Sequence, residues 1–484
     1  MNSVIINDIL DLIGENLVKL INQSLKCGIF PKILKKSLIR PIEKVKNTIE
    51  SSEFRPVNMI TTEAKIYEKI VLHQLEEYFE SNNMISEQQS GFRNKHSCES
   101  LINLVIINWK IAIHNNKIIV AVFLDLRRAF ETLDRNILLL KLSKYGIENI
   151  ELKWFESYLS NRTQQTRVNE VISSEITTSI GVPQGTVLGV FLFLIYINDI
   201  ERVVTNCKLL MFADDALLYV ESDEVRVAVN KINDDLQHLS NWFKMNKMKL
   251  NIDKTKYMIL NSRNVDNCNV IIDDTCLDQI MEIKYLGVII DNKLNFKSHL
   301  DYICKKIAKK LYFFRSIRNK LSVYTSIKIF NSIIKPHFEF CSTIMLMFNN
   351  EMVKRLQVLQ NRGMRIILKK NKFVSKSSLF NSLNWLNVNQ KIKFNVIIFV
   401  FKIINGYLPK YLMEKLNYVG DLTQYNLRNK FDFRLDLFRN SRTQNSLIYK
   451  GLRLYNEIPI ELRNEKNLLK FKKKLETYVR MKFD

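Results

Sequence analysis

Three aspartates are the residues of this sequence whose types and positions best suit chemistry. Asp214 and Asp215 lie at the tip of an apolar hairpin over residues 209–220, and Asp125 ends an apolar run over residues 118–124. Carboxylate oxygens are preferred ligands of hard cations such as Mg²⁺. Two divalent metals about 3.5–4 Å apart can clamp the attacking and leaving oxygens of an in-line phosphoryl displacement. An Asp-Asp pair also suits a simple hairpin turn, so the pair alone leaves that interpretation open.

The elements that must position these acids are predicted from hydrophobic periodicity. Around the acids we expect strands at 118–125 and 256–260, a helical stretch at 134–160 that breaks at Gly146, strand-like alternation over 163–180, an apolar helix over about 188–203 and a helix at 224–245. Upstream we expect helices at 8–26, 62–80 and 97–114 and a strand at 38–42. From about residue 296 the pattern changes to helices that carry many basic residues. The middle of the chain therefore predicts an α/β unit between helical segments.

The composition indicates a folded protein with a polyanionic partner. Its 484 residues suggest about three domains, and 46% hydrophobic residues with few Gly and Pro argue against disorder. Lys and Arg number 73 against 49 Asp and Glu, a net charge of +24. Neutralising phosphates releases counterions, so nucleic acid is the obvious partner. Charge alone leaves an acidic membrane surface or a ribosomal role open.

The cysteines and the apolar runs argue against secretion and membrane insertion. The seven cysteines lie far apart without a Cys-x-x-Cys pair, which favours reduced thiols over a zinc module or a disulfide scaffold. The start of the chain has no basic leader, and the longest apolar runs, 190–197 and 396–400, are far shorter than a membrane span. We therefore expect an intracellular, non-secreted protein.

Further motifs accompany the acids in a fixed order along the chain. They are Phe54-Arg55-Pro56-Val57, Gln89-Ser90-Gly91-Phe92-Arg93 with His96-Ser97, Pro183-Gln184-Gly185, Leu250-Asn251-Ile252-Asp253-Lys254-Thr255 and Tyr285-Leu286-Gly287. With Asp125 and the Asp214–Asp215 pair, this order resembles the reverse transcriptases of non-LTR (LINE-type) retrotransposons. The stretch 123–135 is particularly similar to jockey-like mobile elements of arthropods. The resemblance covers about residues 20–370, and more weakly the tail around residues 455–459.

The resemblance implies an α/β fold of the right-hand polymerase type. Its parts would be fingers, an antiparallel-sheet palm, an α-helical thumb and a mostly helical C-terminal region. We expect the fingers and an N-terminal helix in residues 1–117, the palm in 118–290 with 146–180 returning to the edge of the fingers, the thumb in 291–375, and a region of unknown role in 376–484.

The resemblance also implies roles for the acids. Asp125 would bridge two Mg²⁺ ions, for which Mn²⁺ is a possible substitute, and the carbonyl of Leu126 would be a further ligand. Asp214 would hold the metal that activates the primer 3′-hydroxyl. Asp215 would lie nearby and be less directly engaged.

Other residues would recognise the nucleotide and the primer. Phe130, five positions after Asp125, matches the ring that blocks a ribose 2′-hydroxyl, although a packed core ring is the alternative. Gln184 would contact the incoming nucleotide and the template, and Gly185 would let the chain turn tightly and approach the nucleotide. The remaining implied residues are the triphosphate-gripping cations Arg55, Lys65 and Arg93, the primer grip Tyr285-Leu286-Gly287, and Lys254, or Lys249 instead, as the acid that protonates pyrophosphate.

Basic helices follow the predicted primer grip. Over 302–320 the apolar residues occupy one face, while Lys and Arg lie largely on the others, and residues 354–365 repeat the pattern. A basic helix at this place suits a thumb that follows a duplex backbone. For any single lysine, an ordinary solvated position is an equally good interpretation.

The sequence thus predicts an RNA-directed DNA polymerase that acts on an RNA template, a DNA primer or target DNA, and dNTPs. We expect it in the nucleus or in a cytoplasmic ribonucleoprotein, with no membrane partner. No endonuclease domain or zinc knuckle fits within the chain, so an endonuclease would be supplied elsewhere. A catalytically inactive nucleic-acid-binding relic is the alternative. Phe130 and the Phe-Ala-Asp-Asp form argue against an RNA-dependent RNA polymerase.

Overall fold

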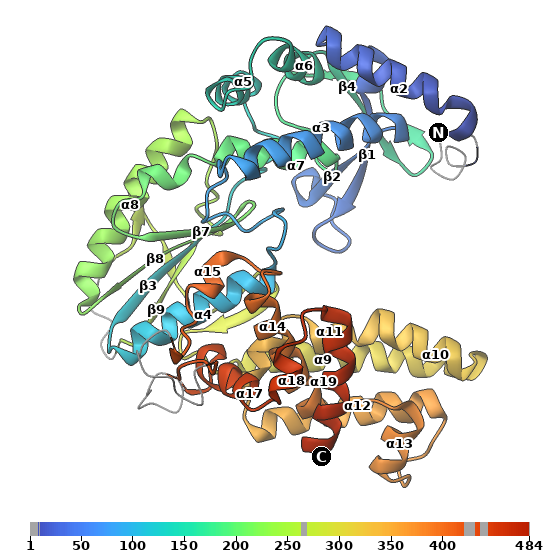
Figure 1. Ribbon diagram of the computed structural model, residues 1–484. Helices are drawn as coiled ribbons and strands as arrows, with labels where there is room; N and C mark the ends of the chain where they lie inside the picture. Colours follow the sequence, from blue (N-terminus) through green and yellow to red (C-terminus); the bar gives the residue numbers. More distant parts are fainter. Residues whose placement is uncertain (1–7, 9, 263–268, 421–430, 436–443, 484) are drawn as a thin grey trace.

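The computed structural model describes residue 8 and residues 10–262, 269–420, 431–435 and 444–483. Its ribbon forms an open arc (Figure 1), with the N-terminal elements at one end, a central sheet in the middle and a group of helices at the other end. No helix in the described part of the chain is long and apolar enough to cross a membrane.

A mixed sheet with flanking helices forms the N-terminal end of the arc. Its strand order is β2-β1-β4-β5, and β6 pairs with β4. β1 and β2 form an antiparallel hairpin, whereas β1 and β4 run parallel. The elements are α2 (Leu10–Cys27), β1 (Lys36–Glu43), β2 (Phe54–Met59), α3 (Thr62–Ser81), β4 (Arg162–Val168), β5 (Val171–Ile172) and β6 (Ile176–Thr178), with short 3₁₀ turns at Lys32–Lys35 and Ser51–Glu53.

The central sheet has the strand order β12-β9-β3-β8-β7. Strand β3 (Ile118–Leu124) pairs antiparallel with both β8 (Asp215–Ser222) and β9 (Lys256–Leu260). Its continuous Ile, Val and Phe run reflects burial on both faces, because alternate residues enter two different hydrophobic clusters. The outer strands are β7 (Lys208–Phe212) and β12 (Asp278–Gln279).

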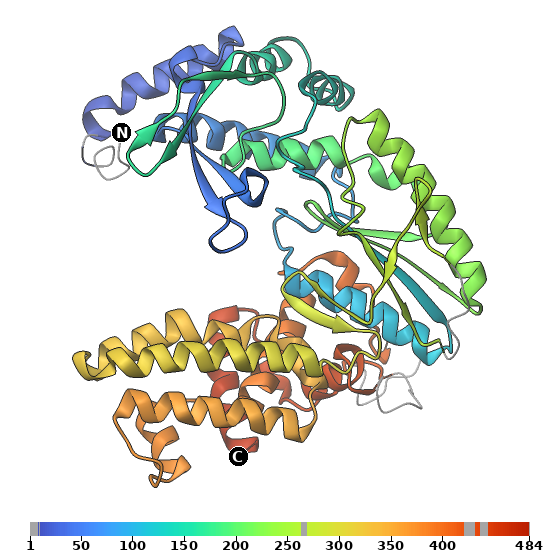
Figure 2. The same ribbon diagram turned by 180° about the vertical axis from the view of Figure 1, so that it is seen from behind.

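Helices cover both faces of this sheet. α4 (Cys98–His114) packs with Ala121 and Phe123 of β3. α7 (Val187–Ile197) and α8 (Val225–Met245) pack with Val120 and Val122. Figure 2 shows α8 along the outer side of the sheet and α4 along its inner side. The central strand β3 is therefore covered on both of its faces.

The expected break in the helical stretch 134–160 is present. α5 (Arg135–Lys144) ends before Gly146, and α6 (Asn149–Leu159) begins after it. Gly146 has a φ of +86°, a left-handed conformation that glycine adopts without steric cost. The expected helix over 188–203 is shorter, because α7 stops at Ile197 and a separate 3₁₀ turn spans Ile200–Val203.

The far end of the arc is helical. A hairpin of β13 (Glu282–Tyr285) and β14 (Val288–Asp291) leads into α9 (Lys297–Ile317), which begins five residues before the expected helix at 302–320. The further α-helices are α10 (Val323–Ile329), α11 (Pro336–Glu339), α12 (Asn350–Leu368), α13 (Lys376–Leu383), α14 (Val388–Ile404), α15 (Lys410–Met413), α17 (Leu452–Asn456), α18 (Ile460–Arg463) and α19 (Leu468–Lys482). The minor elements are β10 (Ile271–Ile272), β11 (Thr275–Cys276), 3₁₀ turns at Arg318–Lys320 and Ser342–Met347, and π turns at Phe330–Ile334 and Leu447–Gly451.

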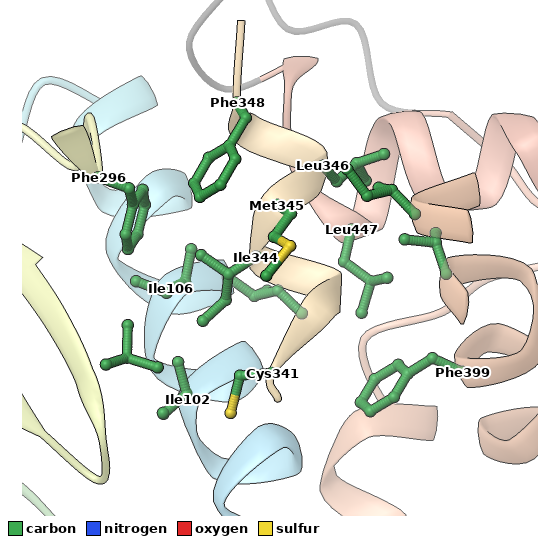
Figure 3. Packing of buried hydrophobic residues seen from close by; sticks show 14 of the residues in the cluster. Ile102, Ile106, Phe296, Cys341, Ile344, Met345, Leu346, Phe348, Phe399 and Leu447 are labelled. Atoms are coloured by element: carbon green, nitrogen blue, oxygen red, sulfur yellow. The ribbon is translucent and has the colours of Figure 1, made fainter. Parts of the chain in front are cut away.

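One hydrophobic core joins the inner face of the sheet to all of these helices. Figure 3 shows Ile106 of α4 beside Ile344, with Phe399 of α14 and Leu447 approaching from the C-terminal elements. The predicted boundary between residues 375 and 376 stays a prediction, and the core crosses it without a break. The C-terminal region is thus packed onto the rest of the fold.

Candidate active site

The strand register gathers the three aspartates at one end of the central sheet. Phe212 pairs with Asp215 across the β7–β8 hairpin, which leaves Ala213 and Asp214 as its two-residue tip. Leu124 pairs with Ala216, so Asp125 follows β3 at the position opposite Asp215. Ala213 has a φ of +57°, a conformation that residues with a side chain rarely adopt. The acids therefore come from adjacent antiparallel strands and lie at the same end of the sheet.

The closeness of these carboxylates affects their pKa values. Burial, followed by the charge of Asp125, raises the pKa of Asp214. Desolvation and then the charges of Asp214 and Asp125 raise the pKa of Asp215 to about 6, although Asp215 is exposed on the surface. Arg55 opposes both shifts. Crowded carboxylates of this kind are the groups that a divalent cation stabilises in their charged form.

Asp125 is held by the loop that precedes β9. The side-chain Nδ2 of Asn251 donates to Asp125 Oδ2 at 2.9 Å, and the backbone N–H of Asp125 donates to Thr255 Oγ1 at 3.3 Å. Leu126 lies opposite Leu250 in an isolated antiparallel bridge. Asn251 belongs to a motif recognised in the sequence, but its role was not predicted: it orients the carboxylate directly.

Gln89 supports the acidic hairpin from the other side. Its side chain is 2% exposed, and Oε1 accepts the backbone N–H groups of Ala213 at 2.9 Å and Gly91 at 2.7 Å. Ser90 N–H donates to the carbonyl of Met211 at 2.8 Å, so this segment extends the sheet beside β7. A Cβ on Gly91 would come within 2.2 Å of the backbone nitrogen of Ala213, which explains the glycine. The motif was noted in the sequence, but this role of Gln89 was missed.

The predicted sugar gate and nucleotide loop lie against each other. The Phe130 ring is partly buried and packs on Phe193, with ring centroids 4.6 Å apart. The backbone carbonyl of Phe130 accepts the N–H of Val182 at 2.9 Å, which connects Phe130 to the Pro183-Gln184-Gly185 loop. The carbonyl of Gln184 accepts the N–H of Asn58 on β2 at 2.8 Å, and Gly185 has a φ of +93°. This loop connects the gate to the β1–β2 hairpin.

The three predicted triphosphate cations have different surroundings. Arg55 is exposed on β2 and acts electrostatically on Asp214 and Asp215, while Lys65 is exposed near the start of α3. Arg93 is instead held by the fold: its guanidinium binds both carboxylate oxygens of Glu80 and the carbonyls of Ser86 and Gln89. These contacts favour a role for Arg93 in shaping the loop that carries Gln89.

The predicted primer grip forms a tight turn beside the helical end. Leu286 and Gly287, with φ of +45° and +84°, are the two turn residues between β13 and β14. A Cβ on Gly287 would meet the Phe340 ring at 2.9 Å. Tyr285 is buried against Phe123 of β3, and its hydroxyl has no hydrogen-bond partner among the described residues. Lys254 and Lys249 are both exposed in the loop beside Asp125.

The carboxylates at this end of the sheet fit a hard divalent cation that is also bound by a substrate. Within the described ranges, no three His, Cys, Asp or Glu side chains gather closely enough to form a metal cage. Mg²⁺ usually takes one or two carboxylates and completes its shell with water and substrate phosphates. The convergent acids meet that requirement.

The chain is similar to several known proteins. The chain is 27% identical over 379 residues to a probable RNA-directed DNA polymerase from transposon X-element of Drosophila melanogaster, covering 77% of this chain and 42% of that protein. It is 25% identical to the RNA-directed DNA polymerase from mobile element jockey of the same species, covering 72% of this chain and 39% of that protein. Among solved structures, an apo telomerase from Candida tropicalis aligns at 12% identity and a TM-score of 0.41, covering 74% of this chain and 66% of that chain.

The family comparison covers more than half of the chain. The chain spans about two fifths of the length of the curated relatives described above. Residues 33–290 match the family model described as "Reverse transcriptase (RNA-dependent DNA polymerase)". This stretch contains the β1–β2 hairpin, the central sheet and the three aspartates. The chain belongs to the reverse transcriptase family and has its right-hand fold, with a palm sheet between fingers and a helical thumb.

Proposed function

We propose that this chain is an RNA-directed DNA polymerase, the polymerase portion of a non-LTR retrotransposon of the jockey-like group. It extends a DNA primer 3′-hydroxyl with dNTPs on an RNA template. The observation that carries the proposal is the register of β3 and β8, which brings Asp125 to the edge where Asp214 and Asp215 lie. Arg55, whose charge acts on the same acids, adds a cation where a triphosphate would bind.

The acids would hold two Mg²⁺ ions, with Mn²⁺ as a possible substitute. Asp125, Asp214, Asp215 and the carbonyl of Leu126 are the proposed ligands. When bound, such ions activate the attacking hydroxyl and neutralise the departing pyrophosphate. Asn251 fixes the Asp125 carboxylate through its 2.9 Å hydrogen bond, so the ligand is preorganised before any cation arrives.

Substrate selection is assigned to the loop and ring beside the acids. Phe130, supported by Phe193, blocks a ribose 2′-hydroxyl, while Gln184 and Gly185 contact the nucleotide and the template. Arg55 and Lys65 grip the triphosphate, and Lys254, or Lys249 in its place, protonates the leaving pyrophosphate. Arg93 takes the structural role described above, because its guanidinium already binds Glu80 and two carbonyls.

The primer and the duplex would lie toward the helical end. The Tyr285-Leu286-Gly287 turn directs the primer terminus, and the basic faces of α9 and α12 follow the phosphate backbone. We place the domain boundaries where the sequence predicts them, with the palm over 118–290 and the thumb over 291–375. The chain would act inside the cell, in the nucleus or a cytoplasmic ribonucleoprotein, with an endonuclease supplied elsewhere.

The decisive experiment measures incorporation of labelled dTTP on poly(rA)/oligo(dT) with Mg²⁺. Wild type is compared with Asp214→Ala and with Glu221→Gln, a control that removes a charge from the far end of the same strand β8. We expect synthesis by wild type and by Glu221→Gln, and none by Asp214→Ala. Binding of the hybrid with equally inert wild type and Asp214→Ala would overturn the proposal in favour of a nucleic-acid-binding relic.

A further inference from the structure

The C-terminal region contacts the segment that supports the acidic hairpin. Tyr411, on the short helix α15, has its hydroxyl 3.2 Å from Ser90 Oγ and 3.2 Å from Ser100 Oγ. Both serines are almost completely buried. Figure 1 shows α15 lying against α4 beside the central sheet. A residue more than 300 positions away in sequence thus bridges two parts of the polymerase fold.

Ser90 is directly connected to the acids. Its backbone N–H donates to the carbonyl of Met211 on β7, and the preceding residue, Gln89, accepts the N–H of Ala213. Gly91 on its other side packs against the backbone of Ala213. A displacement of Ser90 therefore moves the support of the hairpin tip next to Asp214.

Ser100 provides the fixed end of the bridge. Its side-chain oxygen accepts the N–H of Ser97 at 2.9 Å and donates to the Ser97 carbonyl at 2.8 Å, which completes the capping box of α4. The α4 helix is buried in the core that extends into the C-terminal elements. Tyr411 thus connects the segment beside β7 to the capped start of α4.

The surroundings of Tyr411 favour a fixed, neutral hydroxyl. Burial raises the pKa of Tyr411, so the group keeps its proton and can donate one hydrogen bond while it accepts another. The His96 ring packs edge-on against the tyrosine ring, with centroids 5.8 Å apart. The next residue, Leu412, is 1% exposed and anchors α15 in the shared core.

We infer that Tyr411 is a positioning residue for nucleotidyl transfer, through which the C-terminal region holds the Gln89-Ser90-Gly91 segment and thereby the Asp214–Asp215 hairpin. This inference rests on the proposed polymerase function. It gives the C-terminal region a part in the alignment of the acids, through the segment that supports them. Because a displacement of about 1 Å can cost about a hundredfold in rate, a single hydrogen-bonded bridge is enough to matter.

The test compares Tyr411→Phe, which keeps the ring and removes the hydroxyl, with Tyr478→Phe in the full chain. Tyr478 is the matched control, because its hydroxyl donates to the carbonyl of Glu457 at 2.8 Å within the C-terminal region. For Tyr411→Phe we expect a roughly tenfold fall in kcat with little change in KM for dTTP. We expect Tyr478→Phe to retain the wild-type kcat. Equal kcat values for the two variants would overturn the inference.

Two further measurements separate positioning from general stability. The double variant Tyr411→Phe/Ser90→Ala should have a kcat little lower than that of either single variant, because both changes remove the same bridge. If the reductions in kcat of the two single variants instead multiply in the double variant, the inference is contradicted. Amide hydrogen exchange should quicken over residues 88–91 and 211–214 in Tyr411→Phe, and unchanged exchange there also contradicts it. Amide hydrogen exchange can be measured on a protein without polymerase activity. If the wild type proved inert, the proposed function would fail, but the exchange rates would still show whether Tyr411 holds the segment over residues 88–91.

Discussion

Gln89 and Ala213 are joined by a hydrogen bond in which the buried Oε1 of Gln89 accepts the backbone N–H of Ala213 at 2.9 Å. Ala213 is the residue of the hairpin tip with a φ of +57°, so the bond holds a backbone conformation that alanine rarely adopts. The position of Asp214 follows from that conformation. The glutamine amide therefore acts on the acids through the backbone.

The first prediction concerns Gln89→Leu, which fills the same space without an acceptor. The N–H groups of Ala213 and Gly91 lose their partner, and each buried unsatisfied group costs about 1–3 kcal/mol. We expect a lower free energy of unfolding in urea and a fall in kcat for primer extension. Gln237→Leu, on the exposed face of α8, is the control and should change neither quantity. A Gln89→Leu variant with wild-type kcat would show that the bond is dispensable.

The local elements were predictable because their causes lie within a few residues. The run Ile118–Leu124 is entirely apolar and rich in Ile, Val and Phe, and the strand is present at the expected place. Gly146 marks the expected break between two helices. The end of α7 was harder to predict, because Ile200 and Val203 of the separate 3₁₀ turn keep a helix-like apolar spacing beyond the end of the helix at Ile197.

The supporting contacts of the site could not be predicted in the same way. Gln89 reaches a partner 124 residues away, Asn251 reaches Asp125 across 126 residues, and Tyr411 reaches Ser90 across 321. Such pairs depend on tertiary packing, about which periodicity carries no information. Arg93 illustrates the same limit: the motif indicated a cation near the site, but only the fold shows that Glu80 binds it.

The second prediction concerns the pH dependence of stability. The folded-state pKa of Asp215 is about 6, above its ordinary value of 3.8. A raised pKa means that the stability linked to this group is fully present below pH 3.8 and is lost as the pH rises through about 6. Without divalent cations, Asp215→Asn should therefore be more stable than wild type at pH 7.5, and the gain should disappear toward pH 4.

Urea unfolding of both proteins at pH 7.5, 5.5 and 4 tests this prediction. Adding Mg²⁺ at pH 7.5 should narrow the difference, because a cation stabilises the charged carboxylates of the folded wild type. An Asp215→Asn variant that is no more stable than wild type at pH 7.5 would contradict a raised pKa of Asp215.

The third prediction separates the two arginines. Arg55→Ala should raise KM for dTTP about tenfold or more, since a hydrogen bond to a charged group is worth about 1.5–3 kcal/mol, and should leave Tm unchanged. Arg93→Ala should lower Tm, because it removes the donors to the Ser86 and Gln89 carbonyls. Steady-state kinetics and thermal unfolding of both variants check this. The opposite pattern would reverse the roles assigned to the two residues.

The fourth prediction concerns sugar selection by Phe130. Phe130→Val shortens the side chain beside the nucleotide loop while it retains an apolar contact with Phe193. We expect the preference for dTTP over UTP, as a ratio of kcat/KM values, to fall by about 10–200-fold, the usual effect of a small change in pocket size. Incorporation of each nucleotide on poly(rA)/oligo(dT) measures the ratio directly.

Phe191→Leu serves as the control for lost packing. Phe191 lies on the same helix α7 as Phe193 but packs on Phe79 of α3, away from the predicted gate. It should lower stability through the smaller side chain while the ratio of dTTP to UTP use stays at the wild-type value. If Phe130→Val and Phe191→Leu change the ratio equally, Phe130 is a packed core ring and does not select the sugar.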